Sequence, residues 1–181
     1  SAAEAVGDGI DNNCNGAIDE IGPEVCGDEV DNDGNGSVDE VGCMANCVPF
    51  WRDDTMTLVC RDGKNWRSAV NHCAEFGLQL AEIRTFEDWR LLWVWFDVSS
   101  VTPSRANYWI GLRRSGDAFR YEATQDSVAL DSEQWGPGQP DNHFNGEDCA
   151  ELWCDNSNEC SGTWNDQNCT NFRWFLCETV P

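Results

Sequence analysis

Long apolar runs are absent from the 181-residue chain, and basic residues are scarce. The most apolar stretch, residues 91–98, is interrupted by Asp97 and is much shorter than the ~18 residues that a membrane-spanning helix needs. The chain has 11 Lys and Arg against 33 Asp and Glu, which gives a formal net charge of −22. We therefore expect no membrane span, and no nucleic-acid partner because phosphate binding requires a basic surface.

Histidine is also rare, which limits the catalytic chemistry that the chain can support. The two histidines are His72 and His143, and neither is matched by a cysteine that is evidently free for nucleophilic catalysis. The 11 cysteines lack the paired spacing of metal-binding motifs and instead favour a disulfide framework, which forms in an oxidising compartment. We expect a secreted, non-enzymatic protein in which ten Trp and eight Phe build an aromatic core.

Residues 1–46 form a separate segment with two tandem repeats. The segment holds twelve carboxylates and no Lys or Arg, and its pattern recurs at an offset of 20 residues. In each repeat, oxygen-bearing side chains stand at loop positions one, three, five and nine, with Gly at six, so that the oxygens can converge on one Ca²⁺. The predicted ligands are Asp11, Asn13, Asn15 and Asp19 in the first repeat, and Asp31, Asp33, Asn35 and Asp39 in the second.

The twelfth loop position distinguishes these repeats from EF-hands, because Gly22 and Gly42 stand where an EF-hand has its bidentate Glu. The segment instead resembles thrombospondin type 3 repeats and similar short aspartate-rich metal-binding repeats. It would then serve as a spacer or an oligomerising stalk that is ordered by its ions. The alternative is an acidic segment that only keeps the chain soluble.

Residues 47–181 form a second domain with the periodicity of both helices and strands. A helix from residue 66 to about 76 is predicted by the spacing of Trp66, Ala69, Val70 and Cys73. The other predicted elements are a strand pair within 47–60, a helix that begins at Thr85, a strand at 108–112, an irregular polar stretch at 131–148, and strands near 150–153, 162–164 and 172–177. Tryptophans 66, 109, 135 and 164 are predicted to lie in the core.

Four motifs in this domain resemble the signature of the C-type lectin-like domain. They are Trp109-Ile110-Gly111-Leu112, Gln139-Pro140-Asp141, Gly146-Glu147-Asp148-Cys149 and Trp164-Asn165-Asp166. The resemblance implies an α+β fold with two helices, small antiparallel sheets, a long calcium-binding loop region and stapling disulfides.

The resemblance also implies a set of disulfides. The implied pairs are Cys47–Cys60, Cys73–Cys177 and Cys149–Cys169, with Cys154–Cys160 as an additional small loop. Three cysteines remain in residues 1–46. Cys14–Cys26 is the preferred pair, and Cys43 is either free or joins another chain, so this segment is the candidate for oligomer contacts.

The principal Ca²⁺ site of the family would use five residues of this chain. The implied ligands are Gln139, Asp141, Glu147, Asn165 and Asp166. Two neighbouring hydroxyls of one sugar would complete the coordination, each donating a hydrogen bond to a carboxylate and accepting one from an amide. The peptide bond before Pro140 is expected to be cis. A second ion is not expected, because Arg113 and Arg114 occupy the loop after Leu112 and Asp148 alone cannot hold it.

The order amide–Pro–acid goes with galactose and N-acetylgalactosamine in related lectins, and the reverse order with mannose. Galactose lectins of this kind usually present an aromatic ring after the motif; here His143 takes that position, with Phe144 and Trp153 as alternatives. The competing function is a lectin-like domain that binds a protein or another non-sugar ligand, with Ca²⁺ only structural. Glycoside hydrolysis is disfavoured, because carboxylates bound to Ca²⁺ cannot serve as a general acid.

Overall fold

The computed structural model describes residues 46–52, 55–85, 87–88, 90, 92, 106–129, 132–153 and 163–179. Its strands are β1 (Cys47–Arg52), β2 (Thr55–Lys64), β3 (Leu78–Leu80), β4 (Tyr108–Ser115), β5 (Ala118–Tyr121), β6 (Ser127–Val128), β7 (Cys149–Trp153), β8 (Thr163–Gln167) and β9 (Arg173–Thr179). They are accompanied by helix α1 (Trp66–Glu75) and the 3₁₀ turn η1 (His143–Asn145). This content agrees with the predicted α+β class.

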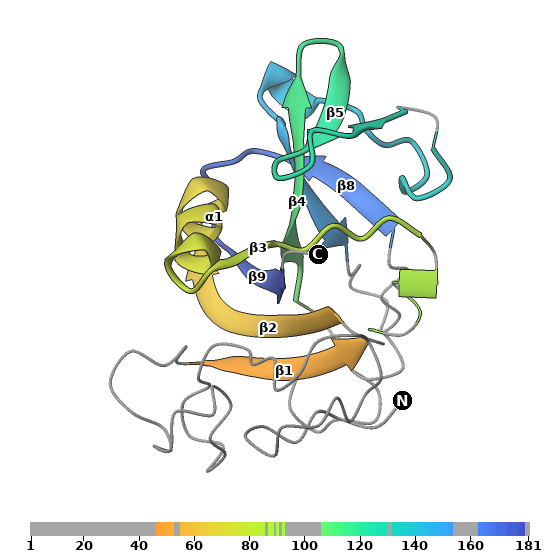
Figure 1. Cartoon of the computed structure of the whole chain (residues 1–181). Helices are drawn as coiled ribbons and strands as arrows, with labels where there is room; N and C mark the ends of the chain where they lie inside the picture. The colour runs from red at the N-terminus through yellow and green to blue at the C-terminus, as the bar shows by residue number, and fades with distance from the viewer. Residues whose placement is uncertain are drawn as a thin grey trace, which may run out of the picture.

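The strands form one connected sheet in the order β1-β2-β9-β4-β5-β6, with β3 added to β9 and the β7–β8 pair added to β4 (Figure 1). The pairings are antiparallel except that of β4 with β9, which is parallel. The resemblance implied several small antiparallel sheets. The parallel pairing of β4 with β9 instead joins the strands into one sheet. Strand β4 is therefore central, since it contacts β5, β7 and β9.

Helix α1 begins and ends where its capping residues require. The Asn65 side chain accepts a hydrogen bond from the backbone N–H of Ser68 at 2.9 Å, which satisfies a donor of the first turn. Trp66, Ala69 and Cys73 are buried along one face, as their spacing predicted. After the helix, Gly77 adopts a φ of 72°, a left-handed conformation that glycine takes without strain.

The start of the second predicted helix has a reciprocal cap. The Thr85 hydroxyl accepts from the Asp88 N–H at 3.1 Å, and the Asp88 carboxylate accepts from the Thr85 N–H at 2.9 Å. Residues 87, 88, 90 and 92 are helical, and Leu92 is buried. The rest of this segment lies outside the described residues.

The four tryptophans predicted for the core are all buried: Trp66, Trp109, Trp135 and Trp164 are each at most 7% exposed. They lie in two clusters, and alternation along β4 places Tyr108 and Ile110 in one and Trp109 in the other. Trp109 packs in the cluster that contains α1, whereas Trp135 and Trp164 belong to the cluster on the other side of the sheet, where they meet edge to face at 5.5 Å.

Several strands are longer than the sequence predicted, and the extensions of β4 and β8 carry residues that matter below. Arg113 and Arg114, expected in a loop, lie within β4, which pairs with β5 as far as Ser115. Asn165 and Asp166, expected after a strand, lie within β8. In both cases cross-strand hydrogen bonds hold polar residues that local propensity would leave in a turn.

The structure contains the three disulfides that the resemblance implies within the described residues. Cys47–Cys60 joins β1 to β2, Cys73–Cys177 joins α1 to β9, and Cys149–Cys169 joins the start of β7 to the turn after β8. Cys154, Cys160 and residues 1–45, with their predicted disulfides and calcium ligands, lie outside the described residues.

Candidate functional site

The long polar segment that leads into β7 has an irregular backbone, as predicted for its composition. The Gln139–Pro140 peptide bond is cis, and Asn142, which precedes the η1 turn, and Asn145, its last residue, have φ values of 46° and 54°. The N–H of Asp141 donates to the Gln139 side-chain oxygen at 3.0 Å. This hydrogen bond holds Gln139 and Asp141 close together within the segment.

Three carboxylates converge beside this loop. Asp141 and Glu147 come from the loop and Asp166 comes from β8, and one ligand oxygen from each lies within 4.8 Å of the others. Asp141 is exposed, Glu147 is half-buried and Asp166 has no exposed surface. The site is thus open to solvent at one side and closed at the other.

Backbone amides of the loop hold the three carboxylates in place. Asp166 accepts from the N–H groups of Asp141 at 3.0 Å and Asn142 at 2.9 Å. The next amide, that of His143, donates to Asp141 at 3.1 Å and to Glu147 at 2.9 Å. Three consecutive N–H groups therefore face carboxylate oxygens, and hydrogen bonds of this kind to charged acceptors are among the stronger ones in proteins.

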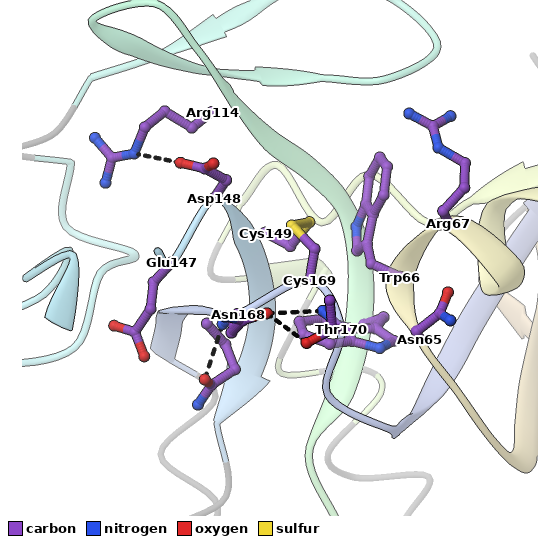
Figure 2. Close-up of a disulfide and its surroundings, with 12 residues drawn as sticks. Asn65, Trp66, Arg67, Arg114, Glu147, Asp148, Cys149, Asn168, Cys169 and Thr170 are labelled. Atoms are coloured by element: carbon purple, nitrogen blue, oxygen red, sulfur yellow. Dashed lines mark hydrogen bonds and ion pairs between the residues drawn. A yellow bond between two sulfur atoms is a disulfide. The ribbon is translucent and has the colours of Figure 1, made fainter. Parts of the chain in front are cut away.

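Arg114 provides a positive charge next to this cluster. Its Nη2 lies 3.1 Å from Asp166 and its Nε lies 3.4 Å from Asp148, the latter contact being visible in Figure 2. The guanidinium also lies 4.6 Å from the centroid of the Phe119 ring. The residue that the sequence offered as a reason against a second ion thus forms ion pairs with two acids of the site.

The Cys149–Cys169 disulfide fixes the strand on which the loop ends (Figure 2). Glu147 and Asp148 directly precede Cys149, and the carbonyl of Asp148 accepts from the Arg114 N–H at 2.7 Å. The side chain of Glu147 points away from the Arg114–Asp148 pair (Figure 2). The covalent link and the backbone hydrogen bond together limit how far Glu147 can move.

The electrostatics of the cluster suit a cation. Burial raises the pKa of Glu147 above its ordinary value, and the nearby carboxylates of Asp166 and Asp141 raise it further, whereas the His143 N–H lowers it. A hard divalent ion takes oxygen ligands and would relieve this repulsion. The donor set of three convergent carboxylates therefore fits Ca²⁺.

The two amides of the predicted ligand set lie beside the carboxylates and have their own partners. Gln139 uses its side-chain oxygen to accept from the Asp141 N–H, as noted above. The Asn165 amide nitrogen donates to Glu151 on the neighbouring strand at 3.1 Å. The structure thus brings together the three acids; in sequence, Asn165 directly precedes Asp166, and Gln139 is separated from Asp141 by Pro140.

The candidates for a sugar-stacking ring have different surroundings. His143 is exposed within η1, close to the three carboxylates. Trp153 is half-buried at the end of β7. The side chain of Phe144 lies outside the described residues, so His143 is the described ring nearest to the loop motif.

Two residues that contact the site had no sequence signal that would assign them. In the sequence, Arg114 was noted only because its positive charge disfavours a second metal ion. Glu151 lies in a predicted strand and belongs to no recognisable motif. Both act through partners 14 or more residues away in the chain, Asp166 for Arg114 and Asn165 for Glu151. A cross-strand register would have been needed to find them.

Comparisons with known proteins identify the family of the domain. The family model of the lectin C-type domain matches residues 62–179. The chain is 30% identical to L-selectin of Mus musculus over 116 residues, which are 64% of this chain and 30% of that protein, and 32% identical to E-selectin of Canis lupus familiaris over 112 residues, which are 62% and 17%. The chain thus spans less than a third of the length of these curated relatives.

A solved structure is similar over most of the domain. The mouse scavenger receptor C-type lectin carbohydrate-recognition domain superposes with a TM-score of 0.55 at 26% identity, covering 75% of this chain and 98% of that one.

The Arg114 contacts give a prediction for stability. Arg114→Gln leaves the buried Asp166 carboxylate with two backbone N–H donors and no cation. We expect the free energy of unfolding in EDTA to fall by about 2 kcal/mol, below the full penalty for an unpaired buried charge because Arg114 is itself 20% exposed. Urea denaturation of the two proteins measures the difference.

The matched control for this prediction is Arg67→Gln. Arg67 pairs with Glu122 at 2.9 Å, but it is 53% exposed, so its loss should change the free energy by no more than about 0.5 kcal/mol. Equal effects of the two substitutions would contradict the role assigned to Arg114.

Proposed function

The chain belongs to the C-type lectin domain family, and we propose that it is a secreted, calcium-dependent lectin that binds galactose-type sugars. The observation that carries the proposal is the convergence of Asp141, Glu147 and Asp166 within 4.8 Å of one another. The name of the mouse carbohydrate-recognition domain gives further support, since it describes sugar binding in a similar fold.

Five residues would hold the ion: Gln139, Asp141, Glu147, Asn165 and Asp166. Asp166 can serve although it is buried, because its carboxylate has about four lone-pair sites and accepts three hydrogen bonds from the described residues. When bound, Ca²⁺ would supply two further coordination places for adjacent hydroxyls of a sugar. The side chains of the chain would then orient those hydroxyls by hydrogen bonds.

The order of Gln139 and Asp141 is the basis for a galactose-type ligand. An amide before Pro140 and a carboxylate after it set which hydroxyl meets a donor and which meets an acceptor. The exposed His143 ring lies next to this pair in sequence and would stack on the apolar face of the sugar. We propose terminal galactose or N-acetylgalactosamine as the recognised residue.

We propose an extracellular location, where the protein would encounter such glycans. The three disulfides join strands and the helix across the domain, and such bonds persist in oxidising compartments. Within the described residues, no helix is long and apolar enough to cross a membrane.

Calcium should be required for sugar retention. We expect the protein to be retained on immobilised galactose in Ca²⁺ and to elute in EDTA. Asp141→Ala should lower the affinity by at least about 100-fold, because it removes a direct ligand and outer partners alone are worth 10- to 100-fold. Affinity chromatography and sugar titration by calorimetry measure the two effects.

Asp117→Ala is the matched control, because Asp117 is also an exposed aspartate but lies in the β4–β5 turn. It should bind like the unmodified protein. Retention that persists after chelation would refute calcium-mediated binding. Calcium binding without any sugar retention would favour the rival function, a lectin-like domain with a non-sugar ligand.

Sugar preference should follow the Gln139–Asp141 pair. Exchanging the two groups, as Gln139→Glu with Asp141→Asn, reverses the hydrogen-bond sense while keeping one carboxylate and one amide. We expect the ratio of galactose to mannose affinity to fall roughly tenfold or more, since unpaired polar groups strongly penalise the wrong sugar. Competition with the free sugars measures the ratio, and the Ca²⁺ affinity should stay unchanged. An unaltered preference would instead assign selectivity to His143 or its neighbours.

We also propose that the two repeats within residues 1–46 bind Ca²⁺. This proposal rests on their repeated ligand spacing, since they lie outside the described residues. Calorimetric titration of the full chain should count about three ions, and the double substitution Asp11→Ala with Asp31→Ala should reduce the count to about one. A single ion in both proteins would identify the segment as an acidic tail.

A further inference from the structure

The carboxylate of Glu151 is buried at the junction of several strands. Glu151 lies on β7, is 1% exposed and forms an ion pair with Arg173 at the start of β9. Its Oε1 accepts from the side-chain amides of Asn107 at 2.9 Å and Asn165 at 3.1 Å. These partners come from β8, β9 and the residue before β4, so one carboxylate joins four chain segments.

A buried ion pair of this kind is not explained by stability alone. Removing two charges from water is costly, and well-packed apolar residues often replace such pairs without loss. Burial also raises the pKa of Glu151, while Arg173 and the two amides lower it. We therefore looked for a functional role of Glu151, and its hydrogen bond with Asn165 indicates one.

The hydrogen bond from Asn165 to Glu151 distinguishes the two ends of the Asn165 amide. A side-chain amide has an oxygen that only accepts and a nitrogen that only donates, and rotation by 180° exchanges them. Glu151 is a pure acceptor when ionised, so it selects the nitrogen. The Asn165 oxygen is then left on the other end of the amide, as an acceptor for a cation.

We propose that Glu151 is a positioning residue that fixes the orientation of the Asn165 amide, so that its oxygen and not its nitrogen serves the calcium site. The inference rests on the proposed calcium site. Arg173 forms an ion pair with the Glu151 carboxylate, and Asn107, the residue before β4, donates to the same oxygen as Asn165. Glu151 thus acts on the ion through Asn165 and does not touch it.

The chain offers a matched control in a second buried Glu–Arg pair. Glu82 is 5% exposed, pairs with Arg84 and accepts from Thr124. It resembles Glu151 in burial and in its partner, but its contacts include none of the five proposed ligands. Any general effect of losing a buried ion pair should therefore appear equally in Glu82→Gln and Glu151→Gln.

The test measures Ca²⁺ affinity by calorimetry and the Asn165 side-chain amide by NMR in EDTA. In Glu151→Gln, the neutral amide has one acceptor oxygen in place of two and brings a donor toward Arg173. We expect Ca²⁺ binding to weaken about tenfold, as when an outer hydrogen-bond partner of a ligand is removed. The Asn165 amide protons should be protected from solvent exchange in the unmodified protein and lose that protection in the variant. Glu82→Gln should change neither readout by more than twofold.

Unchanged Ca²⁺ affinity in Glu151→Gln, or an equal loss in Glu82→Gln, would overturn the inference. If Glu151→Gln does not fold, Glu151→Asp keeps the charge but withdraws the carboxylate by one methylene, and the same loss of affinity is expected. The two proposals fail separately. An unmodified protein that protects the Asn165 amide but binds no Ca²⁺ refutes the calcium site, whereas tight Ca²⁺ binding that is indifferent to Glu151 refutes the positioning role.

Discussion

Carboxylates that approach one another repel, and the region around the site is arranged to hold three of them together. Two unit charges 4 Å apart interact by about 4 kcal/mol at the effective dielectric typical of a protein surface. Asp141, Glu147 and Asp166 lie within 4.8 Å of one another, so their position must be imposed by the fold. The restraints are three consecutive backbone N–H groups of the loop, the cation of Arg114 and the disulfide that follows Glu147.

Strand β8 connects this cluster to the rest of the sheet. Asn165 and Asp166 are consecutive residues of this strand, and their side chains have different partners. Asp166 meets the loop amides and Arg114, while Asn165 meets Glu151. Two proposed ligands are thereby held by two separate networks, one through the β4–β5 hairpin and one through β7 and β9. The register of β8 against β7 is what keeps both in place.

Local patterns were sufficient to predict the helix, most strands, the buried tryptophans and the loop that carries Asp141 and Glu147. Each of these depends on residues close in the chain. Asn65 caps the helix that begins at Trp66, and Thr85 and Asp88 form reciprocal capping hydrogen bonds at the start of the next helix. The lengths of β4 and β8 were not predictable in this way, because long-range pairing holds Arg114 and Asp166 in extended conformation. The partner of Asn165 could not be predicted either, because it depends on the register of β8 against β7, which no local motif predicts.

Arg114 has a further consequence for how many ions the loop can hold. Four acids, Asp141, Glu147, Asp148 and Asp166, lie in or beside the loop, enough charge to attract two divalent ions if nothing else neutralised them. Arg114 contacts Asp148 and Asp166, so it is a permanent positive charge next to the acids that a second ion would need. A guanidinium cannot be removed by chelators and does not lose its proton at physiological pH. It therefore offsets one of the four negative charges when calcium is absent. One divalent ion then reduces the remaining net charge from −3 to −1, so little charge is left to attract a second ion.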